Sequence, residues 1–220
     1  MKKILALILA TMMLFALVAC SNNGENNGTQ TTTQNNNQTE QPTGPSKEEL
    51  AANASIEEIA KALVNKYADY AGMRDTYDQY MAELEEADRI PYEEFISYQL
   101  SVAPVEVGAE WLMGFTAAPT GFSEAYCYQP MMMGQAFIGY IFRVAEGTDI
   151  EAFKTSLKDT CDPRWNICTM ANTTVCESYG DIVYFSMMVI ANEENPDGFT
   201  ADQKQGFYDT FVAAIEKSAK

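Results

Sequence analysis

The chain has 220 residues, with 31 acidic and 14 basic side chains, and its formal net charge is −17 at pH 7. This charge disfavours nucleic-acid phosphates and anionic lipid headgroups as partners. Histidine is absent, which excludes Ser-His-Asp and Cys-His catalysis as well as zinc sites that depend on imidazole.

The N-terminal residues have the layout of an export signal. Two lysines follow the initiator methionine, and residues 4–19 then run without a charge. This run has 16 residues, whereas a membrane-spanning helix needs about 20. Residues 17–20, Leu-Val-Ala-Cys, resemble the lipobox of bacterial lipoproteins. We expect a signal peptide over 1–19, an acyl lipid such as palmitate on Cys20, and the lipid bilayer as a partner through this anchor. Cleavage nearby, with Cys20 left as an ordinary thiol, is the alternative.

A polar segment follows Cys20. Residues 21–47 are almost all Asn, Gln, Thr, Gly, Ser, Glu and Pro, with no aromatic or large aliphatic residue, so they cannot form a core. We expect residues 20–47 to be the lipidated cysteine and a disordered tether that holds the domain on the order of 30 Å from the lipid, on the outer, extracytoplasmic face of the cell membrane. Residues 48–220 suffice for a single globular domain.

Helical patterns come first in this domain. Ser55 and Glu58 form a capping-box pattern that predicts a helix from there to about residue 70. A second helix is predicted over 74–88 and a short third one over 92–100. The acidic residues near the end of the second helix are typical of a solvated face.

Extended patterns dominate after residue 109. Strands are predicted over 110–115, 123–128, 135–144, 173–179 and 181–191, from their β-branched and aromatic content. The turn at 178–181, with Gly180, predicts that the last two strands pair antiparallel. Capping boxes at Thr148 and Thr200 predict an internal helix to about residue 160 and a C-terminal helix. The sequence therefore predicts an α+β fold, with a mainly antiparallel sheet flanked by N-terminal, internal and C-terminal helices.

One stretch resembles a known family. The strand 137–144, the helical segment 149–157, Trp165 and the hairpin sequence 179–185 together resemble a domain of unknown function that recurs in small bacterial surface lipoproteins. The resemblance implies this type of fold and a surface location. It implies no activity, because that family has none established.

Four cysteines lie in the domain, an even number in a chain expected to be exported, where disulfides persist. Three connectivities are possible, and we favour Cys161–Cys168 and Cys127–Cys176. A copper(I) site of these thiols with Met131, Met132 and Met133 is the alternative, since thiolate and thioether ligands suit that ion.

No catalytic motif accompanies these residues, and neither a cofactor nor a metal site is expected. Whether the chain is an enzyme stays open, with the balance against it. The sequence favours a non-catalytic binding module for a protein, a peptide or a cell-wall component, whose contact residues are Trp165, Trp111, Met131, Met132 and Met133. A hydrolase of envelope polymers that uses carboxylates and a copper-handling lipoprotein are the alternatives.

Overall fold

The computed structural model describes residues 44–131, 137–166, 170–189 and 198–219. The predicted signal peptide, Cys20 and nearly all of the tether lie outside these residues. The helices are α1 (Lys47–Asn53), α2 (Ile56–Tyr70), α3 (Met73–Glu83), the 3-10 helix η1 (Glu86–Asp88), α4 (Tyr92–Gln99), α5 (Ile150–Thr160) and α6 (Ala201–Ser218). The strands are β1 (Leu100–Pro104), β2 (Phe122–Pro130), β3 (Phe137–Val144), β4 (Thr173–Tyr179) and β5 (Ile182–Met188).

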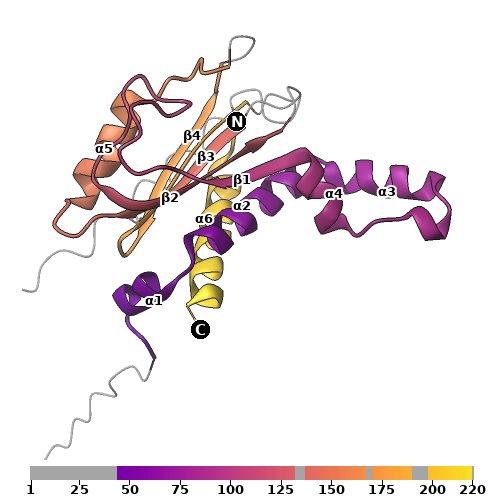
Figure 1. Ribbon diagram of the computed structural model, residues 1–220, viewed down its shortest axis with the longest axis horizontal. Helices are drawn as coiled ribbons and strands as arrows, with labels where there is room; N and C mark the ends of the chain where they lie inside the picture. Colours follow the sequence, from indigo (N-terminus) through magenta and orange to yellow (C-terminus); the bar gives the residue numbers. More distant parts are fainter. Residues whose placement is uncertain (1–43, 132–136, 167–169, 190–197, 220) are drawn as a thin grey trace, which may run out of the picture. The chain divides into compact units, whose positions relative to one another are not determined.

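The strands form one sheet in the order β1-β2-β3-β5-β4, and every neighbouring pair is antiparallel. Helices α2 and α6 pack on one face, while α5 and the loop between β1 and β2 pack on the other (Figure 1). Each face therefore has its own apolar core. The predicted α+β class, with N-terminal, internal and C-terminal helices around an antiparallel sheet, is confirmed.

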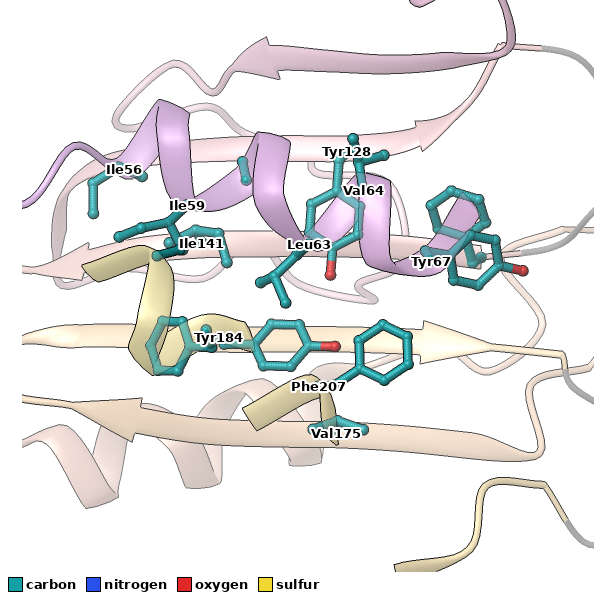
Figure 2. Packing of buried hydrophobic residues seen from close by; sticks show 14 of the residues in the cluster. Ile56, Ile59, Leu63, Val64, Tyr67, Tyr128, Ile141, Val175, Tyr184 and Phe207 are labelled. Atoms are coloured by element: carbon teal, nitrogen blue, oxygen red, sulfur yellow. The ribbon is translucent and has the colours of Figure 1, made fainter. Parts of the chain in front are cut away.

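Helix α2 forms the centre of the first core. Its N-cap residue Ser55 accepts a hydrogen bond from the Glu58 N–H (3.3 Å), as the capping pattern predicts. Residues at helical spacing, including Leu63 and Tyr67, are buried against the sheet. Figure 2 shows this face, with Ile59 of α2 beside Ile141 of β3. The amphipathic pattern of the sequence thus correctly identifies the buried side of this helix.

The N-terminal helices differ from prediction at two places. Helix α1 begins at Lys47, the last residue of the predicted tether, because Ser46 and Glu49 form a capping box there. The helix predicted over 74–88 instead ends at Glu83, and Leu84 is extended. Acidic residues at a helix C-terminus oppose the helix dipole, which accounts for the early end.

The strand predicted over 110–115 is wrong. These residues form a loop in which Phe115 alone makes a β-bridge, to Cys161. Gly108 and Gly114 have φ angles of 84° and 86°, which an extended strand does not adopt. The strand that the sequence analysis missed is β1, which pairs with β2 in the register Val102 to Tyr128.

The predicted turn between the last two strands and the caps of the last two helices are confirmed, although one cap lies one residue later than predicted. Strands β4 and β5 pair as a hairpin around Gly180, whose φ is 58°. Thr200 and Gln203 form the capping box of α6. Helix α5 is capped by Asp149 rather than Thr148, and its carboxylate accepts from the Ala152 N–H at 2.7 Å.

Candidate functional site

A tryptophan and three methionines are among the large apolar side chains that are exposed to solvent in the loops around the sheet. Trp111 is 65% exposed, Met113 37%, Met131 59% and Met170 61%. We call these four residues the apolar rim. Tryptophan and methionine are enriched at protein interfaces, and Met adapts to irregular partners.

Two rim residues are held at the same end of the sheet by backbone hydrogen bonds. Met131 directly follows β2, and its N–H donates to the carbonyl of Gln99, the residue before β1 (2.8 Å). Met170 lies two residues before Asn172, whose N–H donates to the carbonyl of Met188 at the end of β5 (3.1 Å). Both residues therefore lie at the same end of the sheet, which is the end where β1 starts and where β2 and β5 end.

The loop between β1 and β2 brings the other two residues to this end. Gly114 packs so closely on the sheet that a Cβ atom there would lie 3.0 Å from Met187 of β5 and 3.4 Å from Ile138 of β3. Met113 immediately precedes this contact, and Trp111 precedes it by three residues. Three separate loops thus contribute the four residues of the apolar rim.

Hydrogen bonds to β3 and to the end of α5 hold the loop between β1 and β2 in place. The Tyr140 hydroxyl donates to the Met113 carbonyl at 2.7 Å, and the Thr116 N–H donates to the Thr160 carbonyl at 2.7 Å. Trp165, predicted as a contact residue, is half-buried and packs against the second core. Met132 and Met133 lie outside the described residues. Sequence reasoning did not single out Met113 or Met170, because an isolated Met carries no signal of exposure.

Helix α1, which follows the predicted tether, lies at the opposite end of the strands. Arg143, near the end of β3, donates to the carbonyls of Ala51 (2.9 Å) and Ala54 (2.7 Å), at the end of α1. Ala51 is fully buried and lies against Gly180 in the β4–β5 turn. Helix α1 is therefore fixed at the hairpin end of the sheet, away from the apolar rim.

A hollow of about 430 Å³ lies beside Arg143, between the end of β3 and the start of α5. The guanidinium in it already donates to Glu124 (3.4 Å), to Asp181 (3.1 Å) and to the two carbonyls of α1. Four of its five N–H groups are therefore engaged, two of them with carboxylates, and the hollow is a poor site for an anion.

The predicted Cys127–Cys176 disulfide is wrong for this fold. Cys127 pairs with Tyr140, Tyr140 with Phe185, and Phe185 with Cys176, so the two cysteines lie in one row across four strands. Three strand spacings put their Cα atoms about 14 Å apart, while a disulfide needs about 7 Å or less. The same separation prevents both thiols from binding one copper ion. Cys168, the predicted partner of Cys161, lies outside the described residues, so the Cys161–Cys168 pairing stays a prediction.

Burial makes two of these thiols weak acids. It raises the pKa of Cys127 to about 12 and that of Cys176 to about 11. At pH 8 we expect alkylation in the folded protein to be slower than in urea by roughly 100-fold for Cys176 and by even more for Cys127, because the thiolate is the reactive form. Above about pH 9 the thiols of the unfolded chain ionise first, so the free energy of unfolding should fall as pH rises. Mass spectrometry of timed alkylation checks this, and rapid labelling of Cys127 in the native protein would contradict it.

Among the described residues, no group of three His, Cys, Asp or Glu side chains converges on a point where a metal ion could bind. A hydrolase would need a carboxyl with a raised pKa in a cleft. The pKa of Glu57 is instead lowered, chiefly by a hydrogen bond from Lys61.

No helix in the described part of the chain is long and apolar enough to cross a membrane. No protein-family model, curated protein or solved structure matches the sequence or the fold. The likeness of residues 137–190 to the surface-lipoprotein domain therefore stays a prediction.

Proposed function

We propose that this chain is a lipid-anchored, extracytoplasmic binding module that presents its apolar rim to a protein or peptide of the cell envelope. The observation that carries the proposal is the position of the rim, at the end of the sheet opposite to α1. If the chain is anchored at Cys20, the tether enters the domain through α1. The rim then lies at the end of the domain farthest from the tether attachment.

The composition of the rim supports recognition of an apolar protein surface. Exposed Trp111 and the three methionines offer contact area with little charge, and such residues often dominate binding energy. The loop that carries Trp111 is held by hydrogen bonds and by close packing on the sheet, so little ordering is needed on binding. We infer a preformed contact surface with no chemical step.

The proposal is tested by photo-crosslinking on intact bacterial cells. A benzophenone amino acid at position 111 or 170 should give a discrete crosslinked product, and Met113→Ser in the same chain should weaken it several-fold. The matched control position is Tyr80, which is 53% exposed but lies on α3. Cys20→Ser should release the protein from the membrane and abolish the product. Equal crosslinking from position 80, or none from the rim, would refute the proposed function.

A further inference from the structure

Strand β4 is an edge of the sheet with one side unpaired. It pairs with β5 on one side, and among the described residues no strand pairs with the other side. An edge strand presents backbone N–H and C=O groups that can pair with an added strand. The opposite edge, β1, is shorter and ends in Pro104, so it is a poorer acceptor.

A groove of about 460 Å³ follows this edge. It is lined by Lys158 of α5, residues 174–177 of β4, and Lys204 and Tyr208 of α6. Helices α5 and α6 pack on opposite faces of the sheet, so the groove has a wall from each face and the β4 backbone between them. We call this groove the edge slot. An extended segment placed in it would continue the sheet and be held between two helices.

The walls of the edge slot are basic although the chain is strongly acidic. Lys158 and Lys204 are both exposed, and neither forms an ion pair with any residue of the described part of the chain. The third lysine nearby, Lys154, is paired with Glu151 (3.0 Å). Glu177 is the acid that lines the slot. Two unpaired lysines on opposite walls favour a guest whose carboxylates point to both sides of its backbone.

We propose that the edge slot binds an extended acidic polypeptide segment of a partner protein by β-strand addition, as a sixth strand next to β4. Main-chain hydrogen bonds supply the pairing, and alternate acidic side chains meet Lys158 on one face and Lys204 on the other. A second copy of this chain fits less well, because antiparallel pairing of two β4 strands would place Lys158 and Lys204 of both copies in the same interface. This inference is independent of the apolar rim.

The test uses a fluorescent peptide of about ten alternating threonine and glutamate residues, titrated at low salt into the chain without its predicted signal peptide. We expect a Kd below about 1 mM and amide shifts at residues 174–177. Lys158→Glu and Lys204→Glu should each weaken binding about tenfold. Lys217→Glu, on the same helix α6 but near its C-terminus, should leave it unchanged, and Trp111→Ser should leave it unchanged as well.

Two further probes separate strand addition from simple charge attraction. The same peptide N-methylated at alternate residues should lose binding, because it lacks the N–H donors that pair with β4. A threonine–lysine peptide should also fail to bind. Equal binding by the methylated peptide, no binding up to about 1 mM, or amide shifts elsewhere would overturn the proposal. If sedimentation shows a dimer, and if Lys204→Glu dimerises more strongly than the parent, the β4 edge pairs with a second copy of the chain instead.

Discussion

Replacing Gly139 by alanine is expected to lower the free energy of unfolding by about 3 kcal/mol, although the change adds a single methyl group. Gly139 lies in the central strand β3, opposite Tyr128 of β2 and Ser186 of β5. The Tyr128 ring crosses directly over it, so a Cβ atom would overlap the outer atoms of that ring. The ring is buried and lies beside Leu63 and Val64 of α2 (Figure 2). Protein cores are close-packed, so the ring has little room to move.

Urea unfolding of two further variants distinguishes this clash from a general loss of stability. Gly206→Ala, in the interior of α6 with no atom within 4 Å of the new Cβ, should instead stabilise the fold by about 0.5–1 kcal/mol. In a Tyr128→Leu background, which removes the overlapping ring atoms, Gly139→Ala should cost less than about 1 kcal/mol. An unchanged cost in that background would show that the Tyr128 ring is not the cause.

Local signals in the sequence predicted most of the fold. The caps at Ser55 and Thr200 and the turn at Gly180 depend on residues within a few positions of each other, and all three are confirmed. The strand β1 depends on pairing with β2, 18 residues after its end. The five residues of β1 show no regular alternation of apolar and polar side chains that would distinguish them from the end of α4. Such non-local elements are settled by tertiary contacts rather than by local propensity.

The predicted Cys127–Cys176 pairing failed for the same kind of reason. An even number of cysteines indicates disulfides in an exported protein, but it contains no information on strand order. Because the β4–β5 hairpin inserts β5 next to β3, Cys176 lies at the far edge from Cys127. The apolar rim was predictable only in part. Composition pointed to Trp111 and Met131, whereas Met170 joins them through the pairing of Asn172 with Met188.

Replacing Arg143 by methionine is expected to lower the free energy of unfolding by about 2–3 kcal/mol, because it removes two charge-assisted hydrogen bonds to backbone carbonyls. The side chain is 17% exposed and holds the end of α1 through Ala51 and Ala54. Methionine keeps the apolar stem but leaves the Ala54 carbonyl without this donor. Lysine keeps the charge but not the planar fork, so Arg143→Lys should recover only part of the loss.

Hydrogen exchange locates the effect of this substitution. In Arg143→Met the amides of α1 should exchange many-fold faster than in the parent, while those of β3 and β5 should change only by the global loss of stability. Asp181→Asn is the matched control, because this partner is 39% exposed and its ion pair contributes at most about 1 kcal/mol. If amide exchange becomes faster by the same factor in the sheet and in α1, Arg143 stabilises the whole fold. Faster exchange confined to α1 would identify Arg143 as the residue that holds this helix, which follows the predicted tether, on the folded domain.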